Sequence, residues 1–308
     1  MPSVKMPSLK IWGLIAVSML LGAPPAFAHG GEPHDELQSG LGWTTDAWIV
    51  VPVTLSALAF ALGSRRLLQR VRAGRAQLSW RIASYAVGWL TLALALLSPL
   101  HALGERMFTA HMVEHETLMA VSAPLIVLSR PLAFLLFALP DPARRGAARL
   151  WAASGRLRCQ LHSGALATIV HGAVLWLWHM PPVFDAAVTH EGLHRLQHLS
   201  FFLSALWFWW TVLWASSRAA ATWHLFVTMM HMSVLGALMA LAPRVLYGIQ
   251  TSHAAAYGLT PLEDQQLAGL LMWVPAGTVY AGATMAMAAL AIARSGKGAT
   301  HGPVVTRA

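Results

Sequence analysis

Residues 107–128 read MFTAHMVEHETLMAVSAPLIVL. The stretch is mostly apolar over the roughly 20 residues that a helix needs to cross a bilayer, yet its first turns carry two histidines and two glutamates. Ionisable side chains are costly inside a membrane and usually mark a functional site. The stretch therefore predicts a membrane-spanning helix with functional groups near its first end.

The rest of the chain repeats the apolar part of this pattern. Of its 308 residues, 56% are hydrophobic and only 11% are charged, which is too apolar for a soluble chain of this length. We expect an all-α polytopic membrane protein with seven transmembrane helices. The predicted spans are residues 46–63, 82–100, 107–128, 162–180, 194–214, 222–242 and 266–293.

The N-terminal segment differs from the seven spans. Lys5 and Lys10 precede a short apolar run, and Ala26-Phe27-Ala28 then offers small residues of the kind that signal peptidase recognises. We expect a signal peptide cleaved after Ala28, and the alternative is an uncleaved first span. The predicted divisions are a signal peptide at 1–28, an exported histidine-containing tail at 29–45, a membrane domain at 46–293 and a cytoplasmic tail at 294–308.

The distribution of basic residues predicts the orientation of the spans. Sixteen of the 21 lysines and arginines fall in the segments 64–81 and 130–158, in the loop before the sixth span, or after the seventh. Loops that collect positive charge stay in the cytoplasm. The mature N-terminus is therefore expected outside and the C-terminus inside. The net charge of +9 is explained by the basic residues of the cytoplasmic segments. No basic stripe with interleaved aromatics indicates a nucleic-acid partner.

Two histidine pairs are the most informative polar groups. His111 with His115 and His194 with His198 each have the i,i+4 spacing that places two imidazoles on one helix face. In the predicted topology both pairs occupy the outermost turns of spans that run in the same direction. Four imidazoles could then converge on a metal ion or a haem. The alternative is that these histidines are amphipathic anchors at the membrane interface.

Three further residues are candidates for supporting roles. His179 ends the fourth span at the same predicted face, and Met112 adjoins the first pair, so both are possible exchange ligands. Imidazole together with thioether suits copper. Glu114 could accept a ring N–H and orient an imidazole, as carboxylates behind metal ligands do, or it could pair with Arg106 or Arg195. Cys159 is the only cysteine, which excludes an internal disulfide and a two-thiolate metal site.

The motifs of common enzymes are missing. The chain holds no nucleophile elbow, phosphate-binding glycine loop, HExxH or EF-hand pattern. Nothing in the sequence indicates hydrolysis or phosphoryl transfer. We therefore expect a protein that is not an enzyme.

Several blocks of the sequence resemble the polytopic CtaG-type cytochrome c oxidase assembly proteins, over roughly residues 43 to 293. These blocks are HMVEH at 111–115, APLIVL at 123–128, WHMPP at 178–182 and HRLQH at 194–198 followed by FF. The matching positions are His111, His115, His179, His194 and His198. Glu116 departs from the family pattern, which commonly has an apolar residue there, so that face of the helix can differ locally.

The resemblance implies a multi-pass protein of the bacterial plasma (inner) membrane that helps mature a haem-copper oxidase, with copper handled or delivered at the outer face. Its partners would be cytochrome c oxidase subunits or copper chaperones, beside membrane lipid. Two alternatives stay open. One is a membrane haem protein with histidine axial ligands, and the other is a metal-free scaffold for oxidase subunits.

Overall fold

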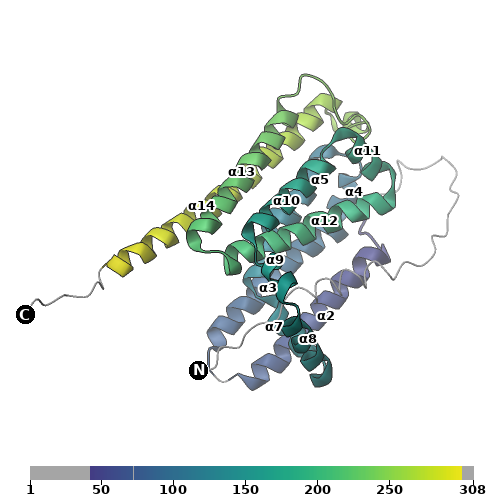
Figure 1. The fold of residues 1–308 in the computed structure, drawn as a ribbon. Helices are drawn as coiled ribbons and strands as arrows, with labels where there is room; N and C mark the ends of the chain where they lie inside the picture. The colour runs from purple at the N-terminus through teal and green to yellow at the C-terminus, as the bar shows by residue number, and fades with distance from the viewer. Residues whose placement is uncertain (1–41, 72, 300–308) are drawn as a thin grey trace, which may run out of the picture. The chain divides into compact units, whose positions relative to one another are not determined.

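The computed structural model describes residues 42–71 and 73–299, and every regular element among them is a helix (Figure 1). The all-α prediction is confirmed. The predicted signal peptide, most of the exported tail and residues 300–308 lie outside the described residues. The chain divides into two compact units, one up to Leu161 and one from His162.

The first unit is built around two long helices and one interrupted helix. Its α4 and α5 pack on each other, and α3 packs on α6 and on the π-helix η1. The elements are α2 (Ala47–Arg70), α3 (Arg75–Leu97), α4 (Pro99–Gly104), α5 (Phe108–Glu116), η1 (Thr117–Ser122), α6 (Ala123–Leu128), α7 (Pro131–Ala138), α8 (Asp141–Ala153) and α9 (Gly155–Leu161).

The second unit is a bundle in which α10 packs on both α12 and α13, and α13 packs along α14. Figure 1 shows α13 and α14 side by side as a long hairpin, in green to yellow. The elements are α10 (Gly164–Trp178), α11 (Pro181–Thr189), α12 (Glu191–Trp210), the π-helix η2 (Thr211–Ala215), α13 (Arg218–Ala240), the 3-10 helix η3 (Ala254–Tyr257) and α14 (Pro261–Ala299).

The number of helices able to cross a membrane agrees with the expected seven. Five helices of the described chain are long and apolar enough to span, and two bent pairs raise the number to seven if each pair is one span. The bends are 66° between residues 108–128 and 131–138, and 65° between 155–161 and 164–178. The predicted orientation of the spans stays a prediction.

The helix ends differ from the predicted spans at the arginine-rich segments. The segment 64–81, expected as a loop, is helical up to Arg70 and again from Arg75. Arginine favours helix almost as well as alanine, and its long stem lets the charge reach water from a helix that has begun to enter the membrane. Apolar periodicity therefore finds the spans but underestimates their length. Likewise α14 continues through Ala299, into the segment expected as a tail.

The bend before α7 has a local cause. Arg130 takes the left-handed conformation with φ of 56°, and Pro131 then begins α7. The new direction brings α7 against α2, where a Cβ on Gly63 would lie only 1.9 Å from the carbonyl oxygen of Phe134. The Arg66 guanidinium donates to the carbonyls of Phe137 and Ala138, at 3.1 and 2.7 Å. One arginine thus satisfies carbonyl groups that the end of α7 leaves without helix partners.

Glycine also sets the distance between α13 and α14. A Cβ on Gly269 would lie 2.4 Å from the amide nitrogen of Ala240 and 2.7 Å from the carbonyl oxygen of Gly236. A Cβ on Gly236 would in turn lie 2.9 Å from the carbonyl oxygen of Gly269. The two backbones meet at a point where neither helix has a side chain. Small residues at such crossings allow the close packing on which membrane helices depend.

We predict that Gly269→Ala destabilises the protein, because the added methyl must push α13 and α14 apart. Overpacking of this kind costs about 1–3 kcal/mol. Thermal unfolding of the detergent-purified protein would measure the loss. Gly282→Ala on the same helix is the matched control, since a Cβ there meets nothing within 4 Å. Equal unfolding temperatures for the two variants would contradict the close crossing.

Candidate functional site

The first histidine pair lies on α5, in the first unit. His111 and His115 are each 1% exposed, and their rings meet edge to face with centroids 4.1 Å apart. A ligand nitrogen of one lies within 4.8 Å of a ligand nitrogen of the other. The i,i+4 spacing therefore brings the two imidazoles together as predicted.

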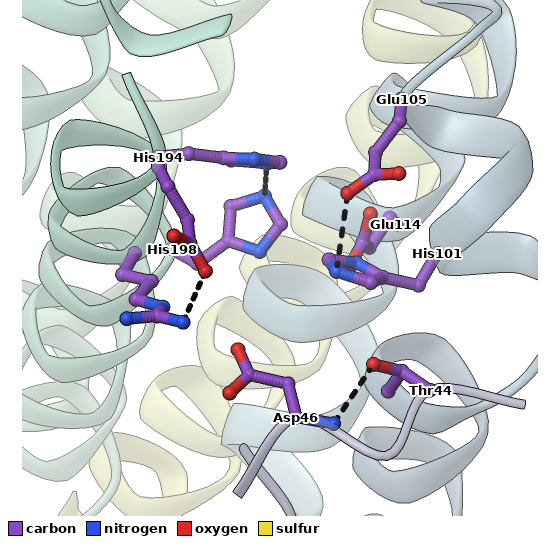
Figure 2. A network of polar contacts seen from close by, with 9 residues as sticks. Thr44, Asp46, His101, Glu105, Glu114, His194 and His198 are labelled. Atoms are coloured by element: carbon purple, nitrogen blue, oxygen red, sulfur yellow. Dashed lines mark hydrogen bonds and ion pairs between the residues drawn. The ribbon is translucent and has the colours of Figure 1, made fainter. Parts of the chain in front are cut away.

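Glu114 lies between the two histidines in the sequence, and its carboxylate has a partner that the sequence did not predict. Glu114 is fully buried, and its Oε1 lies 2.7 Å from Nδ1 of His101. Figure 2 shows His101 close to both Glu114 and Glu105, and the Glu105 carboxylate is 4.0 Å from Nε2 of the His101 ring. The expected alternative partner Arg195 instead pairs with Glu191, four residues away on α12. Glu114 thus contacts an imidazole, as predicted, but this imidazole is that of His101 on α4 and not one of the α5 pair.

Local sequence explains how His101 reaches this position. Ser98 accepts a hydrogen bond from the amide of Leu100, and Pro99 occupies the first turn of α4, an arrangement that starts helices efficiently. Gly104 at the end of α4 permits the close approach to α5, because a Cβ there would lie 3.0 Å from Oε2 of Glu114. The Ser98-Pro99 pair was the sequence signal that the predicted outer loop contains a helix.

The second pair lies on α12, in the second unit. Nε2 of His194 is 3.1 Å from Nε2 of His198, as Figure 2 shows with a dashed line. His198 is 8% exposed, whereas His194 is half-buried near the start of the helix. Two ring nitrogens at this separation can share one proton or one metal ion. Within this pair, His194 is therefore partly accessible to solvent and His198 is buried.

His179 belongs to the same unit and is held firmly. It caps α10 and is 3% exposed. Its Nδ1 donates to the carbonyl of Leu175 at 2.7 Å, which leaves Nε2 as the nitrogen with the lone pair. The hydroxyl of Tyr247 donates to the His179 carbonyl at 2.6 Å, a contact that sequence spacing does not reveal. The WHMPP block thus contains the end of α10, the turn at His179 and Met180, and the start of α11.

The remaining predicted residues are also buried. Met112 is fully buried on α5, and Glu116 is 9% exposed. The use of Met112 and His179 as copper ligands stays a prediction. The two histidine pairs belong to different compact units, each described by itself, so the convergence of four imidazoles on one ion stays a prediction too.

Both histidine helices share one irregularity. Helix α5 continues into the π-helix η1, and α12 continues into the π-helix η2. Pro124 follows η1 in the next turn, and a proline cannot donate the backbone hydrogen bond that a regular helix needs. Short π-helical segments often occur next to functional sites.

The fold and these buried groups define a class of protein: a polytopic helical membrane protein that carries histidine pairs inside its bundle. The sequence matches the family described as cytochrome c oxidase caa3 assembly factor (Caa3_CtaG) over residues 58–294. The chain belongs to this family, which confirms the resemblance found in the motifs.

Curated relatives have been identified in mycobacteria. The chain is 27% identical to an uncharacterized protein of Mycobacterium bovis over 180 residues, which is 56% of this chain and 26% of the relative. It is 28% identical to an uncharacterized protein of Mycobacterium leprae over 173 residues, or 52% of this chain and 25% of the relative. The chain thus aligns with about a quarter of the length of these relatives. No solved structure matches it significantly.

The His101 contact predicts a pH dependence of stability. Burial alone lowers the pKa of His101, but the hydrogen bond and charge of Glu114, with the charges of Glu105 and Asp46, outweigh it and raise the pKa. A raised folded-state pKa gives stabilisation that is complete below the ordinary histidine value of about 6.5 and is lost as the pH rises through the folded-state pKa.

We therefore expect the unfolding temperature of the wild type to fall between about pH 6 and about pH 9 more steeply than that of His101→Asn, in which an amide replaces the titrating ring. Thermal unfolding in detergent at a series of pH values would test this. Parallel curves for the two proteins would show that the His101 contact does not depend on its charge.

Proposed function

We propose that this chain is an assembly factor for a haem-copper cytochrome c oxidase, and that it handles copper through its paired histidines at the outer face of the bacterial plasma membrane. Family membership supports the oxidase pathway. The observation that carries the copper part is the i,i+4 pair on α12, whose two Nε2 atoms lie 3.1 Å apart.

This separation fits a metal ion. Two imidazole nitrogens at about 2.0–2.1 Å from one tetrahedral ion lie about 3.3 Å apart. The rings of His194 and His198 therefore need only a small adjustment to chelate an ion. The pair on α5 offers the same chemistry beside the buried carboxylate of Glu114. An acceptor behind an imidazole raises its strength as a ligand, and His101 is the imidazole that Glu114 holds in this way.

Copper is favoured over zinc by the donor set. The chain lacks the thiolate pairs of structural zinc sites, because Cys159 is alone and exposed. Imidazole with nearby thioether, here Met112 beside the α5 pair, suits copper. We propose copper as cargo to be passed to oxidase subunits or taken from a copper chaperone. Half-buried His194 gives the α12 pair the access that such a transfer requires.

Copper content of the purified protein tests the proposal. We expect wild type to retain copper, and His194→Ala/His198→Ala and His111→Ala/His115→Ala each to retain less copper per chain than wild type, because each change removes one chelating pair. Element analysis by mass spectrometry would measure copper per chain. His253→Ala is the matched control, since His253 is exposed in a loop of the second unit. Copper retained in both pair variants would overturn the proposal.

The same preparations separate the two alternatives. A haem protein would show a strong Soret absorption band and no copper, and the band would be lost in the pair variants. A metal-free scaffold predicts that replacing all four paired histidines by alanine leaves the copper content of the cellular oxidase unchanged. Under our proposal that quadruple variant lowers oxidase copper while the abundance of the assembly factor in the membrane stays normal.

A further inference from the structure

A third pair of histidines lies inside the second unit, away from the paired motifs. His171 is on α10 and His231 is on α13, two helices that pack on each other. His171 has no exposed surface. Both nitrogens of His231 and Nε2 of His171 are buried and have no hydrogen-bond partner among the described residues. Each buried polar atom left unsatisfied costs about 1–3 kcal/mol, so these nitrogens indicate a ligand.

A hydroxyl group contacts one nitrogen of His171. Nδ1 of His171 lies 3.0 Å from the hydroxyl oxygen of Ser204, which also contacts the carbonyl of Phe201 at 3.1 Å. In the tautomer with the proton on Nδ1, Ser204 accepts from His171 and donates to Phe201. Nε2 of His171 is then left with a lone pair and no donor in contact. This is the protonation state in which an imidazole binds a metal.

His231 lies on α13, the helix that packs against α10. Its ring packs over Gly172, the residue next to His171, and its Nε2 would lie 3.3 Å from a Cβ at that position. His231 also lines a groove of about 340 Å³. Because both nitrogens of His231 are buried, they face the interior of the unit and not this groove. The groove is lined by Trp176, Phe226, Val227, Met230, His231 and Val234.

We propose that His171 and His231 form an intramembrane site for a monovalent copper ion. The proposal deepens the copper-handling function and rests on it for the identity of the ion. Two neutral imidazoles are sufficient for Cu(I), which accepts two-coordinate geometry, whereas Zn²⁺ takes four ligands. Met230, which lines the groove next to His231, carries a thioether, another donor that suits Cu(I).

The charge of the unit also favours a monovalent ion. Neither α10 nor α13, the helices that carry the two histidines, contains an acidic residue. No carboxylate on these helices therefore compensates an ion bound at His171 or His231. The free energy needed to transfer an ion into a medium of low dielectric constant rises with the square of its charge, so a divalent ion is disfavoured about fourfold more strongly than a monovalent one.

Titration of the purified full-length protein with Cu(I) against a chromogenic chelator tests the site. We expect His231→Phe to bind one Cu(I) per chain fewer than wild type, and Gly172→Ala, which keeps both ligands but crowds the ring, to bind it about tenfold more weakly. His253→Ala should titrate as wild type does. Without copper, His231→Phe should be at least as stable as wild type, because an apolar ring replaces one with unsatisfied nitrogens.

The outcomes separate this site from the paired histidines. If His231→Phe titrates as wild type does while the pair variants lose copper, the intramembrane site is overturned and the proposed function stands. If only His231→Phe and Gly172→Ala lose copper, the site stands and the role of the pairs is overturned. If wild type binds no Cu(I), both are overturned. A His231→Phe protein that is less stable without copper would assign His231 a structural role and overturn the site.

Discussion

Every polar group inside this bundle needs a partner within the protein, and that constraint shapes both units. In an apolar surrounding no water is available to replace a missing hydrogen bond. Each unsatisfied group then costs free energy comparable to that of a complete hydrogen bond. Helices satisfy the backbone except at their ends. The bend before α7 is tolerable because Arg66 supplies donors to the carbonyls there. The acid Glu114 is tolerable because His101 lies against it.

The same constraint assigns chemistry to individual nitrogens. His179 spends Nδ1 on the Leu175 carbonyl, and His171 spends Nδ1 on the Ser204 hydroxyl. Both imidazoles are on or next to α10, and in His179 the bond to the carbonyl places the proton on Nδ1 and the lone pair on Nε2. The hydrogen bond that a buried ring makes with one nitrogen therefore determines which nitrogen can act as a ligand. This link explains why buried histidines are informative even when their neighbours are apolar.

Much of the fold could be predicted from the sequence, because apolar runs and histidine spacing depend on neighbours within one helix. Span ends were missed where arginines prolong helices, as at Arg70. The contact of His101 with Glu114 could not be predicted, since it requires the short α4 to fold back onto α5. The Tyr247 bond to His179 and the Gly236–Gly269 crossing each join two helices. Their partners share no spacing pattern that a single sequence displays.

The two histidine pairs have different electrostatic surroundings, although their spacing is the same. On α5 the pair has the buried carboxyl groups of Glu114 and Glu116 within one turn, and Glu114 is hydrogen-bonded to His101. On α12 no acidic residue follows Glu191. Beyond its first turn, α12 itself therefore offers only neutral donors, and His194 is half-buried. Identical HxxxH motifs therefore have different chemical surroundings on the two helices, because the residues that follow and precede them along each helix differ.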